Sequence, residues 1–216
     1  MYLLNTADLN FFVNTFISIF AIVNPIGNTP LFLSFTEGKS IKDKKKIAFR
    51  ASLTSFLILL LFIFLGKGIL TAFRVTIPAF HIAGGILIFI IGLTMLHAFR
   101  LWVKTTPHEE KEAVDKEDVA VIPLGIPILS GPGAITTVMV FTFQQPGLEG
   151  KLLVSLASLL TCIITYFVFS ESGYLMKIMG QTEINLLTRL MGLLLTVKAV
   201  QFFINGLSEV IPFLTK

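Results

Sequence analysis

Uncharged, strongly apolar stretches recur six times along this chain of 216 residues, separated by short polar segments. A helix needs ~20 mostly apolar residues to cross the hydrocarbon core of a bilayer, and each stretch is about that length or longer. No polar segment between them is long enough to fold as a domain of its own. The sequence therefore predicts an all-α membrane protein that forms a single transmembrane domain. The six expected helices cover residues 9–35, 47–65, 77–99, 119–143, 152–170 and 184–207.

The first and fourth stretches are longer than a straight helix requires, and proline and glycine interrupt each of them near its middle. The first interruption reads Asn-Pro-Ile-Gly-Asn-Thr-Pro over residues 24–30, and the second reads Ser-Gly-Pro-Gly-Ala-Ile-Thr-Thr over residues 130–137. Backbone groups that leave a helix inside a bilayer need partners from protein, water or a ligand. Interrupted spans in matching positions of two halves are therefore a strong sequence pointer to a transporter's binding site.

The two interruptions belong to an internal repeat. Pro25 matches Pro132 and Gly85 matches Gly192, both at an offset of 107 residues. Each half contains three expected helices, and because three is an odd number the second half must cross the membrane in the opposite sense. We therefore expect two inverted three-helix repeats. Their approximate limits are residues 1–100 and 119–216, with a charged connector over residues 101–118.

Small residues mark the expected contact between the third and sixth helices. Gly85 and Gly92 are seven residues apart, which places them on the same helical face. The repeat offset relates them to Gly192 and Ala199 in the second half. Helices in lipid pack closely where small residues allow their backbones to approach. The pattern predicts tight packing of these two helices through the four positions.

Composition and charge support the membrane prediction and add an orientation. Only 14% of the residues are charged and 54% are hydrophobic, whereas soluble proteins carry about 25% charged residues. The loops after the first, third and fifth spans hold twelve Lys and Arg, and the opposite side holds four. Because basic loops stay in the cytoplasm, we expect both termini outside it, in the inner or plasma membrane. The same rule explains the net charge of +4 without a nucleic-acid partner.

The interruptions also supply the candidate binding groups. A helix that restarts inside the membrane presents unpaired amides and a positive dipole end, which favour a carboxylate. Asn24 or Thr29 can cap the new helix of the first half, and Ser130 or Gly131 can cap that of the second. The alternative is that the prolines only kink helices whose backbone groups find partners in neighbouring helices. The candidate substrate-binding residues are Asn24, Pro25, Gly27, Asn28, Thr29, Ser130, Gly131, Pro132, Gly133, Thr136 and Thr137.

Lys198 is the only charge well inside an otherwise apolar span. A charge at that depth costs ~2.5–3.5 kcal/mol on insertion scales and usually faces the interior of a bundle. Lys198, with Gln201 as its expected neighbour one turn on, is a candidate for binding a carboxylate or for coupling to protons. The alternative is that the long side chain snorkels to the interface, since its counterpart in the first half is the apolar Ile91.

Other reactive residue types form no recognisable site. Cys162 is the single cysteine, so neither a disulfide nor a redox pair is expected. His81 and His97 are too far apart on one helix to share a metal, and we interpret both as structural; His108 lies in the connector. No P-loop, zinc-protease or Rossmann motif is present. We therefore expect neither an enzyme, nor a metal site, nor a cofactor.

Three segments resemble a known family. Residues 24–33 (Asn-Pro-x-Gly-x-x-Pro-Leu-Phe-Leu) look like the first-helix signature of the MarC (UPF0056) integral membrane proteins. Residues 123–135 resemble its fourth-helix signature, and residues 83–87 (Ala-Gly-Gly-Ile-Leu) its third. The resemblance covers nearly the whole chain and implies a six-helix inner-membrane protein related to the LysE-like exporters. Some members are described as transporters of small neutral amino acids such as glycine and alanine. Lys198 is not part of the family pattern.

Together these features predict a secondary transporter of small neutral amino acids that works by alternating access around the two interruptions. Because no ATP-binding motif is present, its energy would come from an ion gradient, most simply of protons. One alternative is a channel or export pore for small solutes, which needs a continuous polar lining. Another is a non-transporting membrane protein that serves as an assembly partner. The lipid bilayer is the expected surrounding in every case, and a homo-oligomer is compatible with each.

Overall fold

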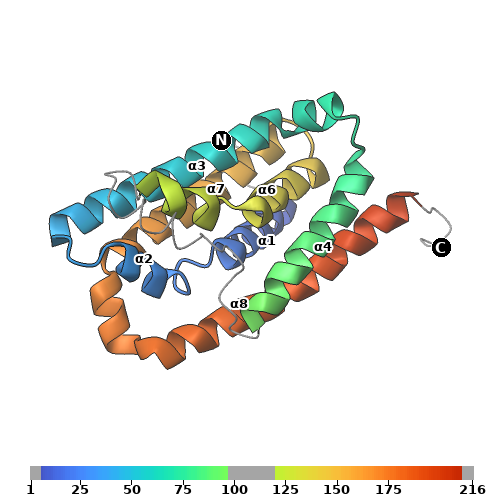
Figure 1. The fold of residues 1–216 in the computed structure, drawn as a ribbon. Helices are drawn as coiled ribbons and strands as arrows, with labels where there is room; N and C mark the ends of the chain where they lie inside the picture. Colours follow the sequence, from blue (N-terminus) through green and yellow to red (C-terminus); the bar gives the residue numbers. More distant parts are fainter. Residues whose placement is uncertain (1–5, 97–119, 211–216) are drawn as a thin grey trace.

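The computed structural model describes residues 6–96 and 120–210, and every regular element in these two ranges is a helix (Figure 1). The all-α prediction is confirmed for this part of the chain. The expected connector over residues 101–118, with His97 and His108, lies outside the described residues. The elements are α1 (Thr6–Val23), α2 (Thr29–Phe35), α3 (Ile41–Ala72), α4 (Ile77–Leu96), the π-helix η1 (Ala120–Leu129), α6 (Pro132–Gln144), α7 (Leu148–Ser170) and α8 (Ser172–Val210).

Five of the described helices, α1, α3, α4, α7 and α8, are long and apolar enough to cross a membrane. The expected first span is divided between α1, with 18 residues, and α2, with seven. The expected fourth span is divided between η1, with ten residues, and α6, with 13. Both interruptions therefore end one helix before the next begins, and the fourth span consists of two short helices instead of one long one.

Two helices extend well beyond their apolar stretches. α3 has 32 residues, whereas hydrophobicity predicts a helix only over residues 47–65. Its polar first turns are helical because the Ser40 hydroxyl caps them, accepting a hydrogen bond of 3.2 Å from the Asp43 amide. α8 begins at Ser172 instead of residue 184, and it bends visibly near its start in Figure 1. The bend lies at Gly180, whose φ of +72° and ψ of 174° are not helical.

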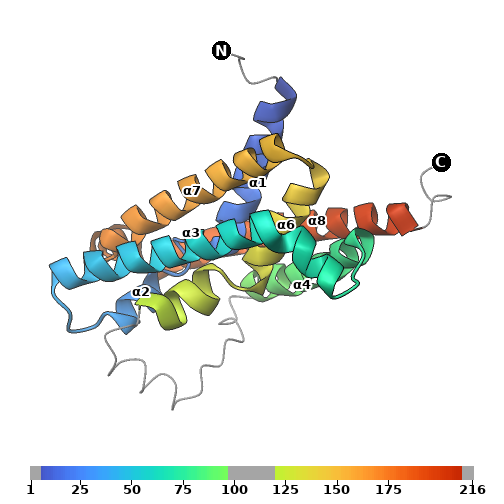
Figure 2. The same cartoon turned by 90° about the horizontal axis from the view of Figure 1, so that it is seen from above.

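The helices pack in a pattern that links the two halves of the chain. α3 and α7 lie side by side and antiparallel (Figures 1 and 2). Lys45 Nζ lies 3.0 Å from Glu171 Oε1 near one end of this pair, and Lys151 Nζ lies 5.3 Å from the centre of the Phe64 ring near the other. α4 and α8 form a second antiparallel pair. α1 contacts α7 while η1 contacts α3, and α2 contacts α8 while α6 contacts α4.

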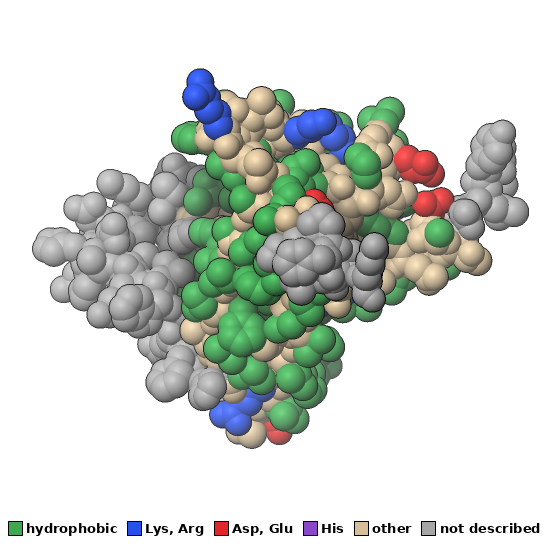
Figure 3. All heavy atoms as spheres, turned by 90° about the vertical axis from the view of Figure 1, so that its right-hand side faces the viewer, with side chains coloured by type: hydrophobic (Ala, Val, Ile, Leu, Met, Phe, Trp, Pro, Cys, Tyr) green, Lys and Arg blue, Asp and Glu red, His purple; other side chains and the backbone are tan. Residues whose placement is uncertain are grey.

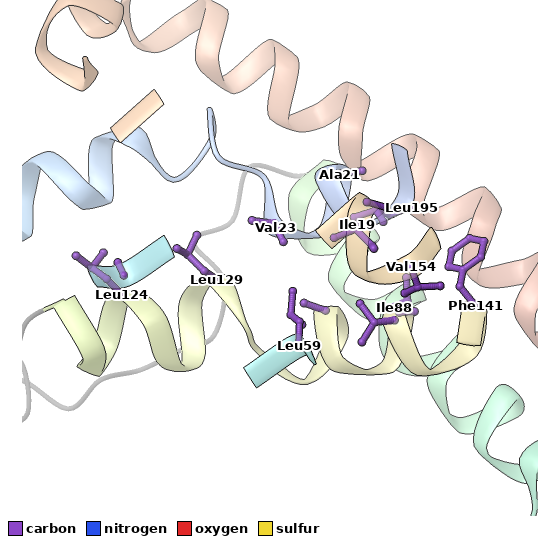
Figure 4. Close-up of a cluster of buried hydrophobic side chains, with 14 of the residues drawn as sticks. Ile19, Ala21, Val23, Leu59, Ile88, Leu124, Leu129, Phe141, Val154 and Leu195 are labelled. Carbon is purple, nitrogen blue, oxygen red and sulfur yellow. The ribbon is translucent and has the colours of Figure 1, made fainter. Parts of the chain in front are cut away.

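A buried apolar cluster holds helices of both halves together (Figure 4). Ile19 of α1, Leu59 of α3 and Ile88 of α4 are at most 1% exposed. Phe141 of α6 and Leu195 of α8 join them and are at most 3% exposed. Burying a side chain of this size stabilises a fold by about 1.5–3 kcal/mol in water, and in lipid the gain comes from close packing instead.

Large apolar side chains also cover the outside of the long helices. Leu57 and Leu65 of α3 and Leu193 of α8 are each at least half exposed. Figure 3 shows one face on which hydrophobic side chains spread across the middle, with Lys and Arg near its top and bottom. A soluble monomer rarely exposes so much contiguous apolar surface, but lipid tails accept it.

Candidate substrate site

The first interruption is a turn over residues 24–28 that joins α1 to α2. Asn24 has a φ of +46°, in the left-handed region that few residues other than glycine adopt. Its Oδ1 accepts a hydrogen bond of 3.2 Å from the Gly27 amide. Asn28 Nδ2 donates a bond of 2.9 Å to the carbonyl of Val23, the last residue of α1. The two asparagines therefore pair part of the backbone that the interruption frees.

α2, the helix that follows the first interruption, starts later in the sequence than Asn24, the first of its two candidate N-caps. The sequence offers two cap-and-start pairs, Asn24 with Pro25 and Thr29 with Pro30; the first placement is wrong, and α2 starts next to the second. The left-handed backbone of Asn24 continues the turn, so Asn28 becomes the N-cap and Pro30 lies in the first turn of α2. Thr29 is fully buried, and its hydroxyl donates a bond of 3.2 Å to the Pro25 carbonyl.

The second interruption is shorter and follows the predicted placement. α6 starts at Pro132, with Gly131 as its N-cap in an extended conformation (φ −67°, ψ 175°). The amide and the hydroxyl of Ser130 both donate to the Gly125 carbonyl, at 3.2 and 2.7 Å. Ser130 therefore ties the end of η1 to the start of α6, and its hydroxyl is occupied by the backbone.

The start of α6 leaves unpaired amides inside the protein. The Ile135 amide donates to the Gly131 carbonyl at 3.1 Å, which is the first helical bond of α6. Pro132 has no amide hydrogen, so Gly133 and Ala134 carry the two amides of this turn that have no intrahelical acceptor. Both residues are buried. These two amides and the helix dipole make this end suitable for a negatively charged group.

The two threonines of α6 differ in what their hydroxyl groups do. Thr137 Oγ1 donates a bond of 2.8 Å to the Gly133 carbonyl. Thr136 Oγ1 has no hydrogen-bond partner among the residues that the structure describes, although its side chain is only 6% exposed and its methyl group packs on Gly84 of α4. The Nδ2 group of Asn24 likewise donates to no described residue. Thr136 and Asn24 are therefore the side chains of the two interruptions that retain free hydrogen-bonding groups.

The two interruptions lie next to each other and are covered by apolar side chains. A β-carbon added to Gly133 would lie 3.0 Å from Ile22 Cδ1, at the end of α1, and 2.6 Å from Ile91 Cδ1 of α4. A β-carbon on Gly27 would collide with Thr188 of α8. Each interruption therefore packs on the last helix of one half, the first on α8 and the second on α4. At both glycines the nearest atoms belong to side chains, which would have to shift to admit a β-carbon.

The four small residues of the expected third and sixth helices lie at the α4–α8 contact. A β-carbon on Gly85 would lie 2.8 Å from the Ala199 carbonyl oxygen, and one on Gly92 would lie 2.9 Å from the Gly192 carbonyl oxygen. One on Gly192 would lie 2.8 Å from the Gly92 carbonyl oxygen. Because these neighbours are backbone atoms, side chains at these positions would push the two helices apart.

Lys198 and Gln201 have different partners from those expected. Lys198 Nζ donates a bond of 3.0 Å to Asn14 Oδ1 of α1, and it lies 5.9 Å from the centre of the Phe141 ring. Gln201 Nε2 donates a bond of 2.8 Å to Asn205 Oδ1 on its own helix. The expected contact between Lys198 and Gln201 is therefore replaced, because one side chain reaches across to α1 and the other runs along α8.

The sequence did not predict a polar pocket that lies where α4 begins and α8 ends. The pocket lies between the start of α4, the end of α6 and the end of α8, and no predicted substrate residue lines it. The sequence signal that could have indicated this pocket is the recurrence of polar residues at helical spacing near the end of the last apolar span. Its polar lining consists of His81, Gln144, Asn205, Ser208 and Glu209.

An all-helical fold with several apolar helices of membrane length, and with two buried helix interruptions, defines a polytopic integral membrane protein. The profile of the MarC family integral membrane proteins matches residues 9–211. This chain belongs to the MarC family, as its sequence motifs predict.

Relatives from distant organisms match the chain over nearly its whole length. It is 41% identical over 207 residues to the UPF0056 membrane protein YvbG of Bacillus subtilis, covering 95% of this chain and 98% of the relative. It is 36% identical over 200 residues to a UPF0056 membrane protein of Aquifex aeolicus (93% and 94% covered). It is 32% identical over 205 residues to YhcE of Escherichia coli (95% of each chain). No solved structure matches the chain.

Proposed function

We propose that this MarC-family protein is a secondary transporter of small neutral amino acids, such as glycine and alanine, with its substrate site at the two interruptions. In this proposal the chain has six membrane spans in two inverted three-helix repeats. α1 with α2 corresponds to η1 with α6, α3 corresponds to α7, and α4 corresponds to α8.

The helix contacts support an inverted repeat. The contact of α1 with α7 is matched by that of η1 with α3, and the contact of α2 with α8 by that of α6 with α4. In each case, replacing both helices of one contact by their counterparts in the other half gives the second contact. α3 and α4 also pack antiparallel to their own counterparts, α7 and α8, as opposite crossing senses require. Transporters built in this way carry substrate at the interface of the repeats.

The observation that carries the proposal is the set of unpaired donors at the two interruptions. The Gly133 and Ala134 amides, the Thr136 hydroxyl and Asn24 Nδ2 have no acceptor among the described residues, yet Asn24 and Thr136 are 8% and 6% exposed. Leaving the two buried amides unpaired costs about 1–3 kcal/mol each, which a ligand with several acceptors would recover. The Thr136 hydroxyl and Asn24 Nδ2 are not fully buried atoms, so such a ligand could also reach them. An amino-acid carboxylate offers such acceptors, and the positive end of α6 favours its charge.

The packing around these donors limits the size of the substrate. Ile22 and Ile91 lie directly on Gly133, and Gly84 lies against the methyl group of Thr136. A carboxylate can reach the amides only after the two isoleucine side chains move aside, so this conformation corresponds to a closed state. Close packing of this kind leaves little room even after the isoleucines move, which favours substrates with small side chains such as glycine and alanine.

Orientation and energy source complete the proposal. The excess of basic residues in three loops puts both termini outside the cytoplasm, in the inner or plasma membrane. An ion gradient, most simply of protons, drives the cycle because the sequence has no ATP-binding motif. Lys198 links the two repeats through its bond to Asn14, and we assign it a coupling role.

The test uses two threonine variants that differ only in what their hydroxyl does. Thr136→Val removes a free hydroxyl and keeps the shape of the side chain. Thr137→Val removes a hydroxyl that is already bonded to the Gly133 carbonyl. We expect Thr136→Val to reduce uptake of labelled alanine into proteoliposomes by at least about tenfold, because it removes a hydrogen bond to a charged group. Thr137→Val should retain most of the uptake.

The outcomes separate transport from the alternatives. Equal uptake by the two variants would refute the assignment of Thr136 to the substrate site. A flux that does not saturate with alanine concentration would indicate a channel. If the wild-type protein neither transports alanine nor gains thermal stability from it, the amino-acid assignment is wrong.

A further inference from the structure

The polar pocket at the end of α4, α6 and α8 is an open hollow on the surface of the protein. Its volume is about 620 Å³, much of it open to the outside. Ile77, Pro78 and Phe143 supply an apolar wall, and the polar groups belong to three different helices. The pocket shares no residue with the proposed substrate site at the interruptions.

His81 points to a missing partner in this pocket. Its side chain lines the pocket and the residue is only 3% exposed. Neither ring nitrogen has a hydrogen-bond partner among the described residues. The nearest charged atom is Glu209 Oε1, at 3.6 Å from Nδ1, which is longer than a hydrogen bond. A buried imidazole that has two free nitrogens and faces a carboxylate is costly unless a ligand or water satisfies it.

The chemistry of the lining selects the class of ligand. Among the described residues that line the pocket, Glu209 alone carries a formal charge at neutral pH, and its side chain is 49% exposed. The His81 ring lies behind that carboxylate, with Nδ1 at 3.6 Å from it, and the Gln144 amide oxygen adds an acceptor, whereas Asn205 Oδ1 already accepts from Gln201. The ring of Phe143 favours a cation over its face. A carboxylate, a further acceptor and an aromatic ring together fit an ammonium group.

We propose that this pocket is a second ligand site, which binds the ammonium group of a small solute or of a lipid headgroup at Glu209, beside His81. The ammonium donates hydrogen bonds to the exposed carboxylate of Glu209, which the buried His81 ring backs at 3.6 Å, and the attached carbon atoms lie against Ile77 and Pro78. The site is independent of the transport proposal, because binding here requires neither interruption.

The polar lining continues from the pocket along one face of α8. At 3.6 residues per turn, five polar residues of α8 lie within an arc of about 100° around the helix axis: Lys198, Gln201, Asn205, Ser208 and Glu209. Gln201 and Asn205 are hydrogen bonded to each other at 2.8 Å, and Lys198 lies at the inner end of the series. A polar stripe along a membrane helix faces protein or water rather than lipid. On α8 this stripe joins the pocket to Lys198, whose side chain reaches Asn14 of α1.

The experiment measures binding of ethanolamine to the full-length protein in detergent at pH 7, by isothermal titration. Ethylene glycol, which has a hydroxyl in place of the ammonium, is the neutral comparison. We expect ethanolamine to bind and ethylene glycol to bind at least about tenfold more weakly. Glu209→Gln and His81→Gln should each weaken ethanolamine binding by a similar factor. Glu183→Gln, a carboxylate change elsewhere on α8, should leave it unchanged.

A second arm distinguishes the two sources of the ammonium group. Titration is repeated in nanodiscs of phosphatidylglycerol, with and without phosphatidylethanolamine. If the lipid occupies the pocket, phosphatidylethanolamine will raise the apparent Kd of ethanolamine; if the site takes a free solute, the Kd will be the same in both discs.

Equal binding of ethanolamine and ethylene glycol would overturn the proposal. So would unchanged binding in both pocket variants, provided that their melting temperatures show that they are folded. Thr136→Val, which tests the substrate site, should not affect ethanolamine binding.

Discussion

The close contact of α4 with α8 provides a quantitative test of the packing. A β-carbon on Gly92 would lie 2.5 Å from Thr196 Oγ1 and 2.9 Å from both the Thr196 amide and the Gly192 carbonyl oxygen. The hydroxyl can rotate away, but the backbone atoms cannot. Gly92→Ala therefore forces the two helices apart or bends one of them. Gly68 of α3 is the matched control, because a β-carbon there would meet nothing within 4 Å.

Two effects of opposite sign determine the size of the change. Replacing glycine by alanine inside a helix stabilises it by roughly 1 kcal/mol, and this gain applies to both variants. Overpacking at Gly92 costs about 1–3 kcal/mol against backbone that cannot move freely, and it applies to that variant alone. A protein of this size shifts its melting temperature by about 2–4 °C per kcal/mol. We therefore expect Gly92→Ala to melt about 2–12 °C below Gly68→Ala.

The assay is thermal unfolding of the purified proteins in one detergent, followed by circular dichroism or tryptophan fluorescence. Gly192→Ala should behave like Gly92→Ala, since each residue lies against the other's carbonyl oxygen. If Gly92→Ala melts at or above the temperature of Gly68→Ala, the close approach of α4 and α8 is wrong, and so is the packing derived from it.

Three further predictions address other features of the fold. Asn24→Val should lower the melting temperature more than Asn24→Gly, because a left-handed φ costs a β-branched residue about 1–3 kcal/mol; equal melting would contradict the turn geometry. Cys162 is 5% exposed, so a maleimide should label it slowly in the folded protein and quickly in denaturant, and rapid labelling of the folded protein would contradict its burial. Lys45→Met removes an exposed ion pair with Glu171 and should leave the melting temperature unchanged, because such pairs contribute little; a large decrease would show that the pair holds α3 to α7.

Periodicity and composition predicted the helical class and the positions of both interruptions, and the motifs at residues 24–33, 83–87 and 123–135 predicted the family. The apolar runs are continuous enough to locate the spans, and a proline inside such a run has few structural solutions in a membrane. The placement of Gly131 and Pro132 at the start of α6 could also be predicted, because glycine before proline fits one helix start well. The positions of Gly85 and Gly92 at a helix contact followed from their spacing alone.

Other features depend on tertiary contacts that no local pattern encodes. The choice of the later of the two predicted starts of α2 follows from the left-handed backbone of Asn24, which the hydrogen bond to Gly27 stabilises. The partner of Lys198 lies 184 residues away along the chain, on α1. The His81 pocket combines residues of three helices, and its histidine alone resembles a structural residue in the sequence. The helical extensions of α3 and α8 consist of polar turns, which hydrophobicity does not report.

Counterflow of alanine tests the central claim of the account most directly. Proteoliposomes that contain the protein are loaded with unlabelled alanine, diluted into a trace of labelled alanine, and sampled over time. A transporter with one site that is exposed alternately to the two sides will accumulate label transiently above equilibrium, and Thr136→Val will reduce that peak while Thr137→Val keeps it. Label that only equilibrates in the wild-type protein, or a peak of equal height in both variants, would contradict a substrate site at the meeting point of the two interruptions.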